Sequence, residues 1–570
     1  MSNMEIAQIL YEVADLLEIK GVRFKPRAYR RAAQTIETLP ETLREIDKRG
    51  ELEKTPGIGA SIAAKIREIL HTGELEYLED LRDELPQGLR ELVEIEGVGP
   101  KTALVLYRKL KISSVDQLEA AAKQGKLRGL KGFGEKTEAN ILQGIAMYRS
   151  AQQRFLLGYV LPVALEVKDQ LRKCEAVNRI SLAGSIRRRK ETIGDVDILV
   201  TSEEPLKAME FLVALPQVER VIAKGKTKST VVLTNNLQVD VRVIEEESFG
   251  SALQYFTGSK QHNIRLRELA IKRNWKLSEY SLLDKKTSRR IAGEEEKSIY
   301  ESLGLRYIEP ELRENRGEVE AAAEGRLPSL LGYGEVRGDL HVHTDWSDGA
   351  YSIQEMAEEA KKMGLEYLAV CDHSKGLRIA HGLTEEDLIK QTNEIRKINE
   401  GIEGFTILSG VEVNIKADGS LDIKNQVLAD LDIVVASIHS GFKQPRGKMT
   451  ERMIAAIHND HVNVIGHPTG RIMNRRKPYD IDLSEVFEAA SAQRVYMEIN
   501  AFPSRLDLSD IDCLRAKDCG LKMAIGTDAH NKDQLRYIDL GVATARRGWL
   551  ERQDVVNTLA VEQLMTMLKR

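Results

Sequence analysis

The chain has 570 residues and a formal net charge of −4, with 30% charged and 5% aromatic residues. It contains no apolar run near the roughly 20 residues that span a membrane, and no signal-peptide pattern, so we expect a cytoplasmic protein with no membrane partner. The four cysteines form no CxxC pair, which argues against a disulfide framework. The length predicts several domains, and the low net charge confines any DNA contact to local basic patches.

The first 145 residues or so are predicted to be entirely helical, beginning with an amphipathic helix over residues 6–17. A Gly-apolar-Gly pattern recurs three times in this region, each time just before a predicted helix. Glycine allows close approach of a ligand, and a helix N-terminus offers free N–H groups to phosphate. A single copy is usually only a turn, but three copies predict binding to a DNA or RNA backbone. The residues concerned are Gly57 and Gly59; Gly97, Gly99 and Lys101; and Gly132, Gly134 and Lys136.

Two carboxylates, Asp195 and Asp197, follow a Gly-Ser turn and a basic run, and they begin a predicted strand. Side chains at positions i and i+2 of a strand face the same way, so Asp195 and Asp197 share a face. Asp240 is a polar residue of a second predicted strand, in which polar and apolar residues alternate. Three aspartates on neighbouring strands can hold a pair of Mg or Mn ions for phosphoryl transfer. The Gly184–Ser185 backbone and Arg188 could cradle a triphosphate beside them. A bare DxD would more often be a solvated edge or a structural ion pair.

The region from about 150 to 245 is predicted to mix strands and helices, with paired strands over 221–243 that carry Lys224, Lys226 and Lys228 on their rim. Phe256 to Ser259 then marks a sharp bend between two helices. An aromatic pair buried at a helix end would explain this bend equally well. The polar residues that follow, Asn263, Arg265 and Arg267, favour the wall of a nucleotide pocket.

Residues 313–334 are charged and poor in aromatics, and we interpret them as a linker. From residue 335 onward short apolar strands alternate with amphipathic helices, a pattern typical of a barrel with parallel strands. Nine of the eleven histidines lie beyond residue 340, mostly at the ends of these strands. Together with nearby carboxylates they form a set too large for one ion, so we expect two or three Mn, Zn or Fe ions and phosphoester hydrolysis. The predicted ligands are His341, His343, Asp348, His373, Glu412, His439, His467, Asp528 and His530.

These features together resemble the bacterial and archaeal family X DNA polymerases, which combine a polymerase beta-like core with a C-terminal PHP (polymerase and histidinol phosphatase) domain. The resemblance implies all-α helix-hairpin-helix domains, an α+β nucleotidyltransferase palm with a thumb, and a distorted, TIM-like α/β barrel. The corresponding boundaries are residues 1–82 (8-kDa-like domain), 83–148 (fingers), 149–245 (palm), 246–312 (thumb), 313–334 (linker) and 335–570 (PHP).

The resemblance also implies residue roles. Asp195, Asp197 and Asp240 would bind the catalytic ions, with Asp240 as base for the primer 3′-hydroxyl. Ser185 and Arg188 would bind the triphosphate, and Gly184 and Gly258 belong to the same site. Tyr255 and Phe256 would contact the sugar, while Asn263 and Arg267 would sense the base pair.

Lys65 matches the family's Schiff-base lysine, which removes 5′-deoxyribose phosphate, and Lys25, Tyr29 and Arg30 match its phosphate-binding surface. A second lysine of that site is Ser61 here, so an ordinary helix-surface lysine is the competing interpretation of Lys65.

We therefore expect a monomeric DNA repair polymerase of base excision repair that fills short gaps in gapped or primed DNA from dNTPs. The PHP domain would add a 3′-5′ exonuclease and an abasic-site endonuclease. Three alternatives remain: a PHP domain that is only a structural or docking module, an untemplated nucleotidyltransferase, and a small-molecule phosphatase.

Overall fold

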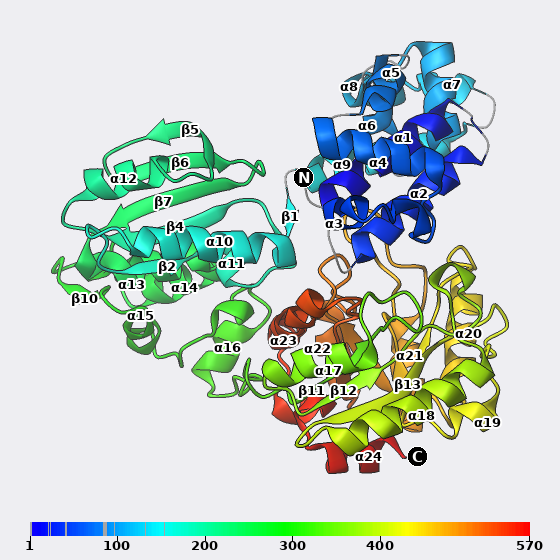
Figure 1. The fold of residues 1–570 in the computed structure, drawn as a ribbon. Coiled ribbons are helices and arrows are strands. Elements are labelled where there is room, and N and C mark those ends of the chain that lie inside the picture. The colour runs from blue at the N-terminus through cyan, green and yellow to red at the C-terminus, as the bar shows by residue number, and fades with distance from the viewer. Residues whose placement is uncertain are drawn as a thin grey trace. The chain divides into compact units, whose positions relative to one another are not determined.

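The computed structural model describes residues 3–20, 22, 24–39, 43–73, 75–83, 88–95, 97–130, 133–152 and 154–569. These residues form two compact units, the first essentially residues 1–153 and the second essentially residues 154–570 (Figure 1). Within the described ranges, every helix is too short or too polar to cross a bilayer.

The first unit is built from helices, as the sequence predicts. In α1 the apolar side chains recur at helical spacing, and Ile6, Leu10, Val13 and Leu17 are buried in one core with residues of α2 and α4. A separate core lies among α6 to α9. The helices are α1 (Asn3–Ile19), α2 (Lys25–Thr38), α3 (Leu43–Lys48), α4 (Ala60–Thr72), α5 (Glu76–Asp83), α6 (Leu89–Glu94), α7 (Pro100–Leu110), α8 (Val115–Lys123) and α9 (Glu135–Gln152).

The second unit opens with a five-stranded sheet in the order β2-β4-β7-β6-β5, which we call the palm. Alternation along β4 buries Val196, Ile198 and Val200, so Asp197 lies on the opposite face. The predicted strand pairing within 221–243 is confirmed, since β5, β6 and β7 pair antiparallel. The elements are β1 (Phe155–Leu156), α10 (Leu157–Arg172), β2 (Ile180–Leu182), α11 (Gly184–Arg187), β3 (Thr192–Ile193), β4 (Val196–Thr201), α12 (Pro205–Val213), β5 (Val218–Lys224), β6 (Lys228–Leu233) and β7 (Gln238–Ile244).

Helices and a small three-stranded sheet follow as the thumb. The predicted bend falls between α13 and α14, where Ser259 caps α14 by accepting a hydrogen bond from His262 N. Residues 313–334 differ from a simple linker, because Arg313 is fully buried and Val319 and Ala322 of α16 join the thumb core. The elements are α13 (Phe249–Thr257), α14 (Lys260–Lys272), β8 (Trp275–Leu277), β9 (Leu282–Asp284), β10 (Arg290–Ala292), α15 (Glu296–Ser302) and α16 (Glu318–Ala323).

The last part is a parallel barrel of seven strands in sequential order from β11 to β17. Hydrogen bonds from Asp528 N to His341 O (2.9 Å) and from His343 N to Ala529 O (2.8 Å) link the first strand to the segment after the last. The predicted parallel barrel is therefore confirmed. Its strands are β11 (Gly338–Val342), β12 (Tyr367–Val370), β13 (Thr406–Asn414), β14 (Ile433–Ser437), β15 (Val464–Ile465), β16 (Tyr496–Asn500) and β17 (Met523–Gly526). Its helices are α17 (Ile353–Lys362), α18 (Glu385–Gly401), α19 (Asn425–Leu428), α20 (Arg446–Ile457), α21 (Leu483–Gln493), α22 (Asp510–Asp518), α23 (Ile538–Arg547) and α24 (Val561–Leu568).

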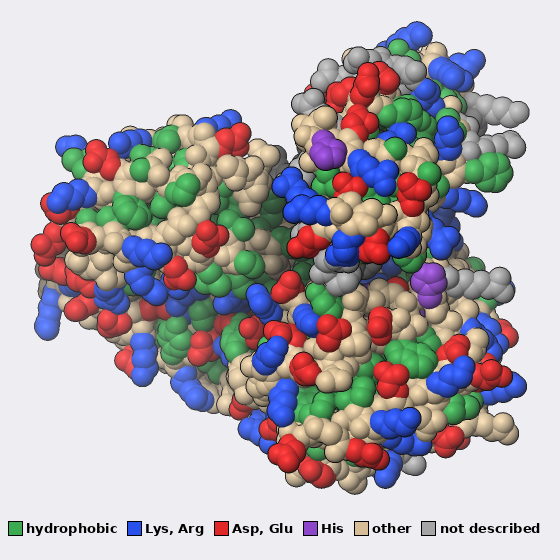
Figure 2. Space-filling model, viewed as in Figure 1, with side chains coloured by type: hydrophobic (Ala, Val, Ile, Leu, Met, Phe, Trp, Pro, Cys, Tyr) green, Lys and Arg blue, Asp and Glu red, His purple; other side chains and the backbone are tan. Residues whose placement is uncertain are grey.

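Figure 2 shows Lys and Arg side chains interspersed with Asp and Glu over the visible face. This mixture agrees with the small net charge of −4.

Candidate active sites

The palm brings the three predicted aspartates to one sheet face. β4 and β7 pair in parallel with Asp197 directly opposite Asp240, and Asp195 immediately precedes β4. Gly184 lies against this group: a Cβ there would come within 2.5 Å of Asp197 Oδ2, and its φ of +63° also favours glycine. The Gly-Ser turn and the carboxylates are thus packed together, as their sequence spacing suggested.

Negative charge accumulates at this position. Burial, together with the charges of Asp195 and Asp240, raises the pKa of Asp197 to about 6. Asp240 is buried and compensated, because Lys228 Nζ lies 3.1 Å from its Oδ2 and Thr230 Oγ1 donates to its Oδ1 at 2.6 Å. A bound cation would remove the remaining repulsion, so the donor set fits a divalent metal. However, the three palm aspartates are not among the described groups whose ligand atoms converge within 4.8 Å.

The repulsion predicts a measurable stability effect. A pKa raised from 3.8 to about 6 in the folded state means that ionised Asp197 destabilises the metal-free protein above pH 6. We expect Asp197→Asn to raise the free energy of unfolding in a chelator by roughly 1–2 kcal/mol at pH 7.5. The gain should vanish below about pH 4, where the carboxyl is protonated in both states. Urea unfolding at both pH values measures it, and an equal gain at both would contradict the repulsion.

A cavity of about 460 Å³ opens beside the aspartates. It contains four of the eight predicted nucleotide residues together with basic and polar neighbours that sequence reasoning did not assign. Its lining is Arg154, Gly184, Ser185, Arg188, Lys190, Glu191, Thr192, Asp195, Asp197 and Phe256. The Arg188 guanidinium, predicted to bind phosphate, is engaged by Glu314 at 2.9 Å and donates to Thr257 O at 2.6 Å.

The other predicted nucleotide residues lie around the bend between α13 and α14, outside the cavity lining. The Asn263 side-chain amide is hydrogen-bonded within the protein. Its Nδ2 donates to Tyr255 O at 2.6 Å and to Gly258 O at 3.2 Å, and its Oδ1 accepts from Gln254 Nε2 at 2.8 Å. Arg267 is exposed and donates to Asn263 O. Sensing of a base pair by Asn263 would therefore require it to exchange these partners.

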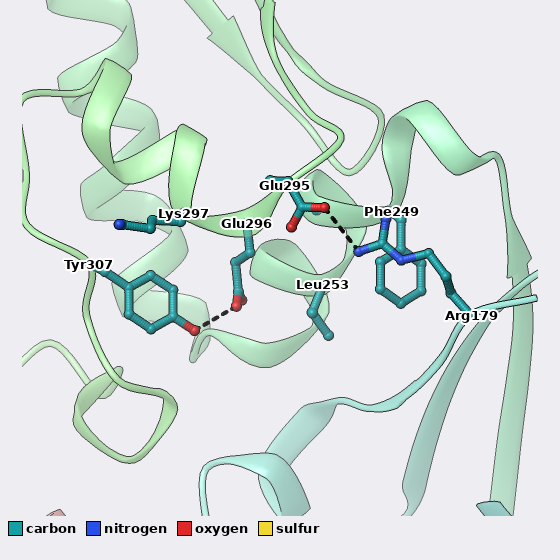
Figure 3. Close-up of a pocket in the computed structure, with 8 residues that line it drawn as sticks. Arg179, Phe249, Leu253, Glu295, Glu296, Lys297 and Tyr307 are labelled. Carbon is teal, nitrogen blue, oxygen red and sulfur yellow. Dashed lines mark hydrogen bonds and ion pairs between the residues drawn. The ribbon is translucent and has the colours of Figure 1, made fainter.

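A second cavity, of about 220 Å³, lies between the palm and the thumb (Figure 3). Arg179 lies over the Phe249 ring and pairs with Glu295, while Tyr307 donates to Glu296 at 2.8 Å. Glu296 is also held by Arg187, with two contacts of 2.8 Å. Because these charges neutralise one another, this cavity is better explained as a structural junction than as a ligand site.

In the first unit, the recurrent glycine turns share one geometry. The residue between the two glycines donates its N–H to the carbonyl three residues before it: Ile58 to Thr55 (3.0 Å), Val98 to Ile95 (2.9 Å) and Phe133 to Leu130 (3.0 Å). Gly59 and Gly99 cap the helices α4 and α7, and Gly134 directly precedes α9. Gly132 and the side chains of Lys101 and Lys136 lie outside the described residues.

The fold does not require glycine at the second glycine position of each turn. A Cβ at Gly59, Gly99 or Gly134 would meet nothing within 4 Å, and none has a positive φ. We expect the triple variant Gly59→Ala/Gly99→Ala/Gly134→Ala to melt within about 2 °C of the wild type but to bind gapped DNA about tenfold more weakly. Fluorescence anisotropy measures the binding. Gly447→Ala, an equally open helical glycine of the barrel, is the control, and unchanged DNA affinity in the triple variant would contradict a backbone-gripping role.

Lys65 is half-buried on α4, and its Nζ lies 4.6 Å from the centre of the Tyr77 ring. Tyr77 in turn stacks on buried Tyr29, at 6.4 Å between ring centres. Arg30 pairs with Asp15 at 2.8 Å and with Glu18 at 2.5 Å. The predicted phosphate surface around Lys65 is therefore partly occupied by internal contacts.

The barrel assembles all nine predicted PHP ligands. Three overlapping groups converge so that their ligand atoms lie within 4.8 Å of one another: His343, Asp348, His373 and His530; His341, His343 and Asp528; and His373, Glu412 and His439. His467 joins them, with Nε2 3.0 Å from Glu412 Oε1. The residues lie at or after the C-terminal ends of β11 to β15 and β17, the edge at which parallel barrels place their chemistry.

The geometry and protonation of this cluster fit metal ions. His341 Nε2 and His343 Nε2 lie 3.2 Å apart, and Asp528 Oδ1 lies 3.1 Å from His343 Nε2. Burial, together with neighbouring His530 and His373, lowers the pKa of His343 to about 3, so its imidazole is neutral and able to ligate. Burial opposes ionisation of Asp528, yet His343, His341 and Arg505 hold its pKa well below the usual value. His343 thus offers a neutral imidazole beside ionised Asp528, the ligand forms that divalent metals need, whereas Glu498 and Glu412 outweigh burial and raise the pKa of His341 well above its usual value.

Sequence reasoning missed a supporting carboxylate, Glu498 on β16. Its Oε1 lies 2.6 Å from His341 Nδ1, and its Oε2 accepts from His467 N, so it fixes the orientation of one ligand and the backbone of another. Glu498 is buried between Met497 and Ile499 on a strand, the pattern that also marks Glu412. A glutamate in an apolar strand was thus a usable signal.

The fold and sites define a polymerase beta-like nucleotidyltransferase joined to a PHP metallophosphoesterase domain, and family models agree. They match a helix-hairpin-helix domain (residues 1–75), a SAM-like helix-hairpin-helix tandem (89–146), a DNA polymerase beta palm (160–270), a DNA polymerase beta thumb (252–314) and a PHP domain (339–502). The DNA polymerase/3′-5′ exonuclease PolX of Bacillus subtilis (strain 168) is 39% identical over 573 residues, covering 100% of both chains. The chain therefore belongs to the PolX family of DNA polymerase/3′-5′ exonucleases.

Further relatives match a smaller share of the chain. A probable phosphatase of Thermoanaerobacter sp. (strain X514) is 35% identical over 231 residues, which covers 39% of this chain and 89% of the relative. The probable phosphatase YcdX of Escherichia coli O1:K1 / APEC is 32% identical over 204 residues, covering 34% and 78%. Each of these matches therefore covers less than half of this chain.

Proposed function

We propose that this chain fills short gaps in DNA repair by template-directed addition of dNTPs at the palm site. The observation that carries the proposal is the pairing of Asp197 with Asp240 on adjacent strands, beside a cavity lined by Ser185 and Arg188. Mg or Mn ions held by Asp195, Asp197 and Asp240 would neutralise charge on the reacting phosphate. Three glycine turns that can grip a DNA backbone support a gapped or primed duplex as partner of a monomer.

The palm residues have distinct roles in this proposal. Asp240 accepts the proton of the primer 3′-hydroxyl, while Lys228 and Thr230 hold its carboxylate in place. Ser185 presents its backbone N–H to the triphosphate at the start of α11, and the Phe256 ring, packed edge-on against Tyr255 at 5.2 Å, contacts the sugar. Asn263 and Arg267 sense the base pair once they turn toward it.

The barrel is proposed to hydrolyse phosphodiesters at 3′ ends and at abasic sites. Two or three Mn, Zn or Fe ions held there would activate water and bind the phosphate. The chain's own contribution is to orient the ligands, with Glu498 fixing His341 and Glu412 lying between His373, His439 and His467. A second candidate activity, phosphate release from monoesters, is favoured by the likeness of part of the chain to probable phosphatases. Comparing p-nitrophenyl phosphate with a labelled primer as substrate separates the two.

A template-swap assay tests the polymerase proposal. On a one-nucleotide gap, the added nucleotide should follow the template base through all four choices. Addition independent of the template would instead support an untemplated nucleotidyltransferase.

A third proposed activity, removal of 5′-deoxyribose phosphate by Lys65, can be tested separately. We expect borohydride to trap a covalent adduct with abasic DNA in the wild type and not in Lys65→Ala. Absence of an adduct in the wild type would reduce Lys65 to a helix-surface cation over Tyr77.

A further inference from the structure

The loop between β16 and α22, residues 502–507, contacts both the palm and the metal-ligand cluster of the barrel. On the palm side, Leu506 is buried in the palm core together with Leu540 of α23. Pro503 packs so closely on α10 that a Cβ added at Gly158 would come within 2.7 Å of its ring. The loop is therefore fixed by the palm as well as by the barrel.

On its other side the same loop reaches a predicted metal ligand. Arg505 Nε lies 3.4 Å from Asp528 Oδ2. The two carboxylate oxygens of Asp528 have different neighbours, because Oδ2 also accepts from Asn500 Nδ2 at 3.1 Å, whereas Oδ1 lies 3.1 Å from His343 Nε2. Arg505 and Asn500 thus hold one oxygen of the carboxylate, which fixes the direction in which the other meets the histidine.

Arg471, four residues after the predicted ligand His467, fixes the backbone that carries Arg505. Its Nε donates to Arg505 O at 2.8 Å, and its Nη2 donates to Leu506 O. The same Nη2 lies 2.7 Å from Glu191 Oε2. Because the Arg471 side chain is only 12% exposed, salt screens this ion pair little.

Glu191 belongs to the palm, where it lines the polymerase cavity. Its backbone is held within the palm, since Glu191 O accepts from Leu157 N at 3.0 Å. The buried Nη1 of Arg505 has no hydrogen-bond partner among the described residues, so the position of this guanidinium depends on the backbone that carries it. A palm carboxylate is thus linked through two arginines to a carboxylate of the metal-ligand cluster.

We propose that Arg505 is a positioning residue of the barrel's metal site and that the palm holds it in place through Glu191 and Arg471. The proposal rests on the metal-dependent hydrolysis proposed above for the barrel. In this arrangement the palm completes the metal site of the barrel, because it sets the carboxylate of Asp528. Replacing Glu191 should therefore weaken Mn binding at a cluster to which Glu191 contributes no ligand atom.

The test measures Mn affinity by isothermal titration in the full-length chain carrying Asp195→Ala/Asp197→Ala, so that these palm aspartates do not contribute. In this background we expect Arg505→Gln to raise the dissociation constant for Mn by about 10- to 100-fold, and Glu191→Gln or Arg471→Gln by about 3- to 10-fold each. The Glu191→Gln/Arg471→Gln combination should match Arg471→Gln within about twofold, because both substitutions break the same link.

Arg546→Gln is the matched control. Arg546 is an equally buried arginine of the barrel, 12% exposed, that pairs at 2.8 Å with Glu311 of the preceding segment. Its side chain also donates to Leu331 O, so these partners lie outside the 502–507 loop and the cluster. We expect it to lower the melting temperature about as much as Arg471→Gln does, with the Mn affinity unchanged.

Primer shortening by the same variants supplies a second readout. The Mn concentration that gives half the maximal rate should rise in parallel with the dissociation constant, while the KM for DNA stays constant. Wild-type Mn affinity in Glu191→Gln would overturn the role of the palm, and wild-type affinity in Arg505→Gln, or an equal loss in Arg546→Gln, would overturn the whole proposal. A parent protein that binds Mn but shortens no primer would refute the hydrolysis, whereas the affinities would still decide whether the palm positions Asp528.

Discussion

The double variant Asp195→Ala/Asp197→Ala should extend a gapped primer at least about 10³-fold more slowly than the wild type. Asp197 lies directly opposite Asp240, so removing both neighbouring carboxylates leaves only one of the three predicted metal ligands. Extension of a 5′-labelled primer with all four dNTPs measures the loss. Extension within tenfold of wild type would contradict the assignment of the palm site.

The same variant should still shorten that primer in Mn when dNTPs are omitted. The palm aspartates contribute nothing to the nine-residue cluster of the barrel, so hydrolysis there should persist. An intact primer, with the cluster shown by elemental analysis to be metal-loaded, would make the barrel a scaffold for this substrate, and the nuclease assignment would fall.

The second large effect is expected at Glu412. This buried carboxylate lies 2.6 Å from His373 Nδ1, 3.0 Å from His467 Nε2 and 3.3 Å from His439 Nε2. Glu412→Gln should reduce primer shortening by about 10²–10³-fold and lower the metal content, while primer extension stays within about twofold.

A second substitution, on β16, compares the loss of a predicted metal ligand with the loss of a residue that orients one. Glu498→Gln alters the support of His341 and of the His467 backbone and should cost about 10- to 100-fold in metal affinity or hydrolysis. The control is Glu366→Gln, which removes a half-buried carboxylate paired with Arg337 and absent from the ligand cluster. Equal losses at Glu412 and Glu498 would contradict the distinction between a ligand and its support.

Most of the residues of the two candidate metal sites could be predicted from local sequence. Strand alternation placed Asp197 and Asp240 on polar faces, and positions at strand ends predicted the histidines that the barrel brings together. The amphipathic pattern of residues 6–17 likewise predicted α1 and its buried side, because one face of a helix must leave water.

Other features depend on contacts between distant segments. The charged composition of 313–334 suggested a linker, but Arg313 is buried where Glu296 neutralises it, a partner that composition cannot reveal. The sequence shows no hydrogen-bond partner for the Asn263 side chain. In the structure, the bend between α13 and α14 brings backbone carbonyls and Gln254 to its amide.

The sequence by itself determined the two chemistries, the polar face of each strand and the glycine turns, because these follow from residue type and short-range periodicity. Only the tertiary structure decided which charged side chains form ion pairs with a group of opposite charge. Arg188 and Lys190 are two residues apart in one basic run, but Glu314 pairs with Arg188 and leaves Lys190 facing the cavity. That difference is set by long-range packing, since an ion pair requires two side chains to meet in space whatever their separation along the chain.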